Sequence, residues 1–233
     1  MDRWVVGIDY GASKTGKGSF SLFLSSSNSP SCIIPSAIAY EDGGRVVSAW
    51  GHQAQSAVGS RPYTYTKLLV EPSRLVDPVR QAEHRRFLGS ETSRLPRSKD
   101  CASVIGDYLH HVREAFARDM MHHYHTATLP PVDWWFTLPV TWNFDGEDVM
   151  QAAISKAGFY AREEDRVGYL SEAEAAMLAV IHDRGTVPHT GSVTVVCDMG
   201  SATTELACYR NDEDIPLTLR ELVPFDGVMQ GGF

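Results

Sequence analysis

Two segments far apart in the chain share one pattern, and this repetition constrains the fold more than any other feature. The first segment is WVVGIDYGASKTGKGSFSLF (residues 4–23), and the second is VTVVCDMGSATTELACY (residues 193–209). In each, an apolar β-branched run ends at an aspartate, an Asp-x-Gly turn of small residues follows, and an alternating stretch returns. Two such strand–Asp–turn–strand units are a stronger signal than either alone, and they predict two similar β-hairpins.

The remaining segments predict a mixture of strands and helices. Residues 10–18 are a cluster of turn formers, and 19–25 are predicted as the returning strand of the first hairpin. Residues 52–100 are rich in proline, arginine and serine and predict loops with short elements. The other predicted strands are 32–40, 45–51 and 134–140, and residues 167–185 are predicted as a short strand followed by a helix. The other predicted helices are 100–125, with Asp100 as N-cap, and 145–159, ending at Gly158. This order predicts an α/β fold with a mixed sheet.

Composition and charge narrow the class of protein. Of the 233 residues, 43% are hydrophobic and 21% are charged, as in ordinary globular proteins. The net charge of −8 argues against nucleic acid or an anionic membrane as the main partner. Four scattered cysteines without a CxxC motif, no basic and apolar leader and no apolar run of ~18 residues predict a cytoplasmic, reducing location.

The two hairpins resemble the paired phosphate loops of the actin-like ATPase superfamily, which contains actin, the sugar kinases and the DnaK-type heat-shock chaperones. FTLPVTWNFDGEDVMQAAISKAGF (136–159) resembles the chaperone segment in which a strand ends at proline and a helix ends in Ala-Gly-aromatic. LSEAEAAMLAV (170–180) resembles the segment that supplies the glutamate near the hydrolytic water. Its Glu-Ala-Glu-Ala-Ala form, with AWGHQAQ and YTKLLVE upstream, is most similar to the divergent chaperone relatives of fungi and animals.

The resemblance implies a specific domain organisation. Residues 1–190 would form a first, ribonuclease-H-like (actin-like ATPase) lobe with a mixed five-stranded sheet and flanking helices, including a peripheral subdomain over about 40–115. Residues 191–233 would be the opening hairpin of a truncated second lobe, since VPFDGVMQGGF resembles a stretch near the middle of the family's ATPase domain. An incomplete lobe leaves a strand edge and apolar surface, which predicts a homodimer or a partner covering residues 193–233.

The resemblance also assigns roles to individual residues. Asp9, Glu172 and Asp198 keep the catalytic acidic positions, where Asp9 and Asp198 would hold Mg²⁺ through water and Glu172 would orient the attacking water. Lys14 is either a new phosphate cation or a solvated loop lysine. The phosphate-binding positions implied by the resemblance are Gly11, Ser13, Lys14, Thr15, Gly200, Ser201 and Thr203.

Several family features are missing from the loops. Ala12 and Ser13 follow the first Asp-x-Gly where the family has two hydroxyl residues, the position of the family's catalytic lysine falls at Gln55, and Ser201 and Ala202 replace glycines. Losing one electrostatic donor commonly costs ~10²–10³ in rate, and each Cβ at a positive φ costs roughly 1 kcal/mol. We therefore expect ATP or ADP to bind weakly or not at all, with impaired or absent hydrolysis and no peptide-folding activity.

Three hypotheses stay open at this point. The chain is a degenerate chaperone-like ATPase domain, a repurposed biosynthetic enzyme acting on a small phosphate- or diphosphate-bearing substrate with Mg²⁺, or a fragment of a longer chaperone-like protein. The predicted 100–125 helix adds a separate question, because its histidines have spacings suited to a metal site. Helix C-termini favour histidine through the helix dipole alone, which is the alternative explanation. These residues are His110, His111, His122, His123 and His125.

Overall fold

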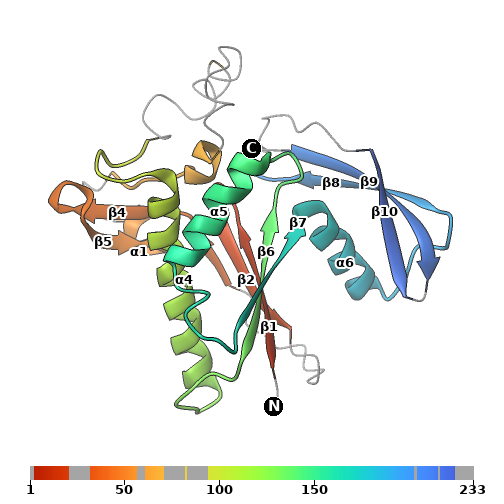
Figure 1. The fold of residues 1–233 in the computed structure, drawn as a ribbon, viewed down its shortest axis with the longest axis horizontal. Coiled ribbons are helices and arrows are strands. Elements are labelled where there is room, and N and C mark those ends of the chain that lie inside the picture. Colours follow the sequence, from red (N-terminus) through yellow and green to blue (C-terminus); the bar gives the residue numbers. More distant parts are fainter. Residues whose placement is uncertain are drawn as a thin grey trace. The chain divides into compact units, whose positions relative to one another are not determined.

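The computed structural model describes residues 3–20, 32–56, 61–70, 82, 94–201, 204–214 and 216–223. Contacts group the chain into two units, each of which is described by itself. The first unit comprises Met1–Phe136 and Asn143–Gly168, and the second comprises Thr137–Trp142 and Tyr169–Phe233. Figure 1 labels most of the helices and strands of both. No helix in the described ranges is long and apolar enough to cross a bilayer.

A mixed five-stranded sheet with the strand order β3-β2-β1-β6-β7 forms the centre of the first unit. The central strand, β1, runs antiparallel to β2 on one side and parallel to β6 on the other. The predicted α/β class with a mixed five-stranded sheet is therefore confirmed. The strands are β1 (Trp4–Tyr10), β2 (Lys14–Phe20), β3 (Cys32–Pro35), β6 (Val132–Leu138) and β7 (Arg166–Ser171), of which β6 and β7 end in residues grouped with the second unit.

The two faces of β1 differ because its side chains alternate. Val6, Ile8 and Tyr10 are buried, whereas Asp9 is exposed on the opposite face. In β6, the buried side chains of Trp134 and Phe136 extend the same apolar face. Helix α4 (Cys101–His123) packs against this face, with the ring of Phe116 edge-on to Trp134 at 5.3 Å between centroids. The core of the first unit lies on this face, and Asp9 lies on the other.

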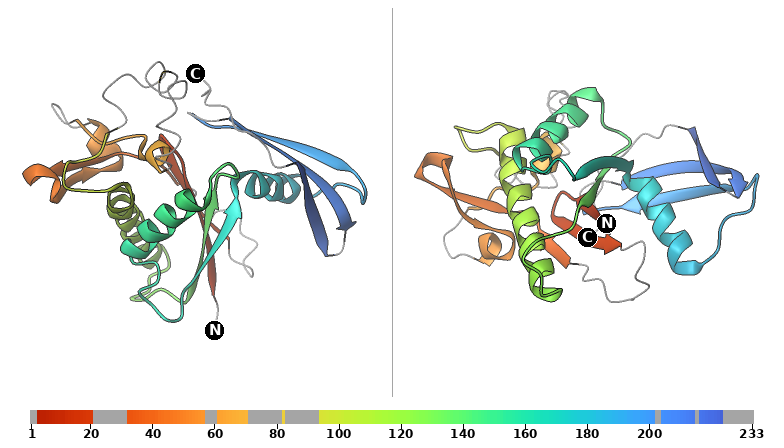
Figure 2. Two further views of the ribbon diagram at one scale, coloured as in Figure 1. Left: turned by 45° about the horizontal axis from the view of Figure 1, so that its top comes forward. Right: turned by 60° about the horizontal axis from the view of Figure 1, so that its bottom comes forward.

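Local capping explains where α4 and α5 (Phe144–Lys156) begin and end. The Asp100 carboxylate accepts a hydrogen bond from Ser103 N–H at 2.7 Å, which confirms the predicted N-cap. Asn143 caps α5 in the same way, accepting from Gly146 N–H. Gly158 has φ +86°, the left-handed conformation that favours glycine at a helix stop, as predicted. The two helices pack on each other in Figures 1 and 2.

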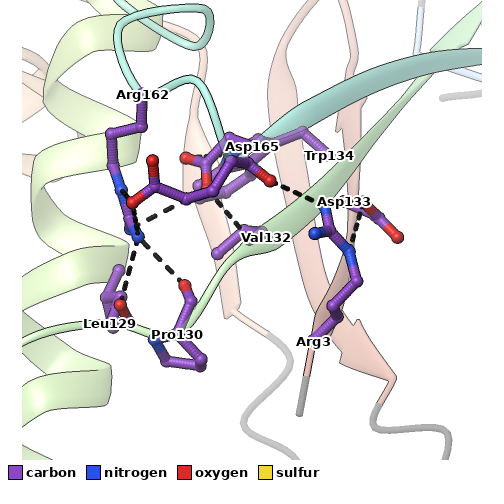
Figure 3. A network of polar contacts seen from close by, with 9 residues as sticks. Arg3, Leu129, Pro130, Val132, Asp133, Trp134, Arg162 and Asp165 are labelled. Atoms are coloured by element: carbon purple, nitrogen blue, oxygen red, sulfur yellow. Dashed lines mark hydrogen bonds and ion pairs between the residues drawn. The ribbon is translucent and has the colours of Figure 1, made fainter. Parts of the chain in front are cut away.

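A polar network ties Arg3, which precedes β1, and the first residues of β6 to the loop that precedes β7 (Figure 3). The buried carboxylate of Asp165 accepts from Val132 N–H at 2.9 Å and from Trp134 Nε1–H at 3.4 Å. Arg3 donates to Asp133 Oδ1 at 2.6 Å and to the backbone carbonyl of Glu164 at 2.8 Å. This network sits at the end of β1 far from Asp9, so it anchors the sheet rather than the predicted site.

Short elements surround this sheet and correct two predictions. The stretch 32–40 was predicted as one strand, but Ser36 and Ala37 interrupt it because the Ser36 N–H bonds to Ser13 O instead of a neighbouring strand. Strand β2 begins at Lys14, inside the predicted turn of 10–18, and residues 21–25 of the predicted returning strand lie outside the described ranges. The short elements are β4 (Ile38–Glu41), η1 (Asp42–Gly44), β5 (Val46–Trp50), α1 (Gly51–Ser56) and η2 (Thr66–Leu69).

The second unit is a three-stranded antiparallel sheet with one helix on one face (Figures 1 and 2). Ala173 and Met177 of the helix pack with Ala207 and Tyr209 of the sheet. The predicted second hairpin is confirmed, and a third strand that was not predicted extends it. The elements are α6 (Glu172–Arg184), β8 (Val193–Met199), β9 (Thr204–Asp214) and β10 (Leu217–Val223). The predicted domain boundary lies near residue 190, whereas contacts group α6 with β8–β10.

Candidate functional site

Hydrogen bonds from one serine, Ser36, stabilise the β1–β2 turn. Ser36 donates its backbone N–H to Ser13 O at 2.8 Å and its hydroxyl to Gly11 O at 2.7 Å. Its hydroxyl also lies 2.9 Å from the hydroxyl of Thr15, which is fully buried. Thr15 therefore supports the turn, and two of the turn's carbonyl oxygens are directed toward Ser36.

Position 11 requires glycine because the backbone of Lys14 lies very close to it. A Cβ atom built at this position would lie 2.3 Å from the carbonyl oxygen of Lys14, a distance that real Cβ contacts do not reach. The Asp-x-Gly pattern of the first repeat thus has a steric reason, because only glycine lets the turn close this tightly. By contrast, a Cβ at Gly16 in β2 would meet Asp9 Cβ at an ordinary 3.8 Å.

Charged side chains flank this turn at the surface. Asp9 and Lys14 are both exposed, and Ser13 is half-buried. Tyr10, which follows Asp9 in the sequence, is buried, and its hydroxyl lies 2.5 Å from the hydroxyl of Thr66 in η2. Burial, the largest cause, raises the pKa of Tyr10, so its hydroxyl stays neutral and able to donate. The end of β1 and the start of β2 thus place one carboxyl group and one amino group at the surface on either side of the turn.

Lys67 is a buried lysine that was not predicted from the sequence as a site residue. Its side chain is only 8% exposed, and it directly follows Thr66, the residue that contacts Tyr10. Lysine is rarely buried without a compensating partner. The position singled out in the sequence, Gln55, lies exposed on α1. The available signal was a lysine within the apolar run TKLLV, which is unusual for a solvated loop.

In the second unit, the β8–β9 pairing sets two carboxylates directly opposite each other. Asp198 pairs with Glu205, and Glu205 is only 3% exposed. The Thr141 hydroxyl donates to Glu205 Oε1 at 3.1 Å. Like charges opposite each other on one face destabilise a sheet unless something compensates them. Asp198 was predicted from the sequence and Glu205 was not, although strand alternation on either side of the turn puts both on one face.

Glu172 is the first residue of α6 and is half-buried. The N-cap is Ser171, whose hydroxyl accepts from Glu174 N–H at 3.0 Å and lies 3.2 Å from the Tyr209 hydroxyl. Burial raises the pKa of Tyr209; the hydrogen bond with Ser171 lowers it, and the negative charges of Glu221, Glu174 and Glu205 raise it further. The first turn of α6 is itself acidic, since it carries Glu172 and Glu174.

The predicted site residues fall into two groups. Unit one brings together Asp9, Gly11, Ser13, Lys14 and Thr15 at the β1–β2 turn. Unit two holds Glu172 on α6, Asp198 at the end of β8, and the following Gly200 and Ser201, while Ala202 and Thr203 lie outside the described residues. Their catalytic, metal and phosphate roles stay predictions.

The histidines of α4 do not form a metal site in the described part of the chain, where no group of three or more His, Cys, Asp or Glu side chains is placed to hold an ion. His111 instead stacks on Trp50 at 5.6 Å between ring centroids. His122 and His123 lie in the last turn of α4, where the helix dipole favours them.

Comparison with known proteins gives no family: no family model matches the chain, and no curated protein matches it.

Proposed function

We propose that the β1–β2 turn is a phosphate-binding site of actin-like ATPase ancestry, which takes a diphosphate group together with Mg²⁺ and supports ATP hydrolysis slowly or not at all. The observation that carries this proposal is the turn itself. Gly11 admits no side chain, Ser36 braces the turn, and the turn is flanked by exposed Asp9 and Lys14.

The chemistry of the turn suits a phosphate. Tight turns offer backbone N–H groups to anions, and glycine allows a ligand to approach the backbone closely. The Lys14 ammonium supplies a positive charge for phosphate oxygens. Mg²⁺ prefers carboxylate and water oxygens, so Asp9 is the residue in this unit that would hold it through water.

The wider ancestry is also part of the proposal. A ribonuclease-H-like lobe is supported by the mixed sheet order with β1 at its centre and by the second hairpin, β8–β9, of matching form. Slow or absent hydrolysis is supported by Ala12, which places no hydroxyl in the turn, and by the exposed Gln55 on α1. The proposal assigns no peptide-folding activity to this chain.

A second candidate function is a Mg²⁺-dependent biosynthetic enzyme acting on a small diphosphate-bearing substrate. The pairing of Asp198 with the buried Glu205 favours this alternative. Two opposed carboxylates repel each other, and a divalent cation would relieve that repulsion. Such an enzyme would recognise the diphosphate rather than a nucleotide base.

Isothermal titration calorimetry tests the proposal and separates the two candidates. Titrants are pyrophosphate, ADP and ATP, each with and without Mg²⁺. We expect Mg²⁺–pyrophosphate to bind, Mg²⁺–ATP to bind no better than about millimolar, and both Asp9→Asn and Lys14→Gln to weaken the binding. Asp42→Asn, which changes an exposed aspartate on η1, is the matched control and should leave binding unchanged.

Three outcomes decide the matter. No binding of any titrant would overturn the proposed function. ATP binding far tighter than pyrophosphate binding would overturn the claim that the nucleotide site is degenerate. Pyrophosphate binding that survives Asp9→Asn but is lost in Glu205→Gln would move the ligand to the acidic pair and favour the enzyme alternative.

A further inference from the structure

Among the strands that the structure describes, β8 has one strand neighbour, whereas β1 has two. In the first unit, β1 pairs with β2 on one side and with β6 on the other. In the second unit, the order is β10-β9-β8, so β8 pairs with β9 and ends the sheet within the described residues. An edge strand offers unpaired backbone N–H and C=O groups, which form a template for another strand.

The side chains of β8 show which face is uncovered. Alternate residues point away from α6 and are exposed: Val193 is 54% exposed, Val195 66% and Met199 72%, and Cys197 belongs to the same set. The residues between them are half-buried, and Val196 packs against the α6 cluster. The uncovered face of β8 is therefore an apolar stripe of four residues without a charge, which marks an interaction surface.

We propose that the occupant of this edge is a second copy of the chain, whose β8 pairs antiparallel with the first about a two-fold axis at Val196. All seven residues of β8 then pair. Val193 lies opposite Met199 of the second copy, and Val195 lies opposite Cys197 of the second copy. The exposed stripe continues from one copy into the other, as an isologous interface requires.

Charge supports this occupant and this register. Asp198 is the only charged residue of β8, and the two-fold axis at Val196 sets it opposite Thr194 of the second copy. No like charges meet, whereas an axis at Asp198 itself would bring two carboxylates together. Because each chain carries a net charge of −8, a strand with a single charged residue, which this register keeps away from its copy, is a favourable place for two copies to meet.

Light scattering after size-exclusion chromatography gives the first test. The measured mass should be twice the 25.7 kDa of the 233-residue chain. Val195→Lys should convert it to the monomer, because a lysine on an edge strand blocks pairing. Val46→Lys is the matched control: Val46 is 55% exposed on β5, and this substitution should leave the dimer intact. Circular dichroism of both variants checks that they remain folded.

Disulfide trapping gives the register. Val195 also faces Cys208 across its own β8–β9 pairing, so the trap is built on Cys208→Ser. Adding Val195→Cys should produce a covalent dimer through Cys197 of the second copy, since directly opposed residues have Cα atoms ~4.5–5.5 Å apart, within disulfide range. Adding Val193→Cys instead faces a methionine and should give none, and Cys197→Ser should abolish the Val195→Cys product.

A monodisperse monomer would overturn the proposal. A dimer that persists in Val195→Lys, or that is trapped equally well by Val193→Cys and Val195→Cys, would also overturn it, because the contact would then lie elsewhere or in another register. The proposal does not depend on phosphate binding: the dimer is expected without ligand and in Asp9→Asn.

Discussion

Asp198 and Glu205 lie directly opposite each other on β8 and β9, and the Glu205 carboxylate is buried beside the Thr141 hydroxyl. In EDTA, we expect Glu205→Gln to raise the free energy of unfolding by about 0.2–1 kcal/mol, the range given by cross-strand pairs. Glutamine keeps an oxygen for Thr141 while removing one of the two charges. Urea denaturation followed by circular dichroism measures this difference.

Repeating the denaturation of the wild type and Glu205→Gln with Mg²⁺ tests whether the two carboxylates bind a cation. If the carboxylates hold a cation, Mg²⁺ should stabilise the wild-type chain and have less effect on Glu205→Gln. A wild-type chain that is already more stable than the variant in EDTA would show that the two carboxylates do not repel each other.

Substitution of Gly11 should be costly although it lies in a surface turn. In Gly11→Ala, the added Cβ would meet Lys14 O at 2.3 Å, so the turn must open. Overpacking of this kind costs about 1–3 kcal/mol. Gly16→Ala, five residues along, places its Cβ in ordinary contact and should change stability by well under half of that amount. Equal losses for the two variants, measured by urea denaturation, would contradict the steric account.

The sequence predicted those elements whose signals are local. Asp100 and Gly158 mark helix ends because a side-chain cap and a positive φ act within one turn. The predicted start of β2 was too late in the sequence, because its first residues, beginning Lys14-Thr15-Gly16, favour turns by composition. Pairing with β1 and β3 nevertheless makes them a strand. Tertiary pairing overrode local preference at this point.

The candidate site was predictable to a similar extent. The repeated Asp-x-Gly pattern located both turns. Glycine is needed at position 11 because of a contact with Lys14, only three residues away, so this signal is local. Lys67 and Glu205 were missed because their burial depends on neighbours distant in sequence: Thr66 contacts Tyr10, and Glu205 receives its bond from Thr141. Composition does not distinguish such residues from solvated charges.

Asp165 should be essential to the first unit. Asp165→Ala leaves Val132 N–H and Trp134 Nε1–H without the acceptor that both use, and each buried unsatisfied group costs about 1–3 kcal/mol. We expect a loss of roughly 2–6 kcal/mol in unfolding free energy. Asp133→Asn, which weakens the more exposed ion pair with Arg3, should cost less than about 1 kcal/mol. A ranking in the opposite order would contradict the network in Figure 3.

Acidification should weaken the contact between Trp50 and His111. Burial lowers the pKa of His111 in the folded state, and the neighbouring His110 and Arg118 lower it further, against the opposing effect of Asp107 and Glu114. The unfolded chain therefore binds the proton more readily, so the stabilising contribution is present above the unfolded pKa of ~6.5 and is lost as pH falls through the folded value.

The variant His111→Phe keeps an aromatic ring against Trp50 and removes the titration. Between pH 7.5 and pH 5, thermal unfolding of the wild type should lose more stability than that of His111→Phe. Identical pH profiles for the two proteins would show that His111 does not contribute to acid sensitivity.

A crystal structure of the chain soaked with Mg²⁺ and pyrophosphate tests the central claim most directly. The account predicts phosphate density at the β1–β2 turn, within hydrogen-bonding distance of backbone N–H groups of residues 11–14 and of Lys14 Nζ, with Mg²⁺ linked to Asp9 through water. An empty turn at saturating pyrophosphate, or phosphate bound elsewhere in the chain, would contradict it.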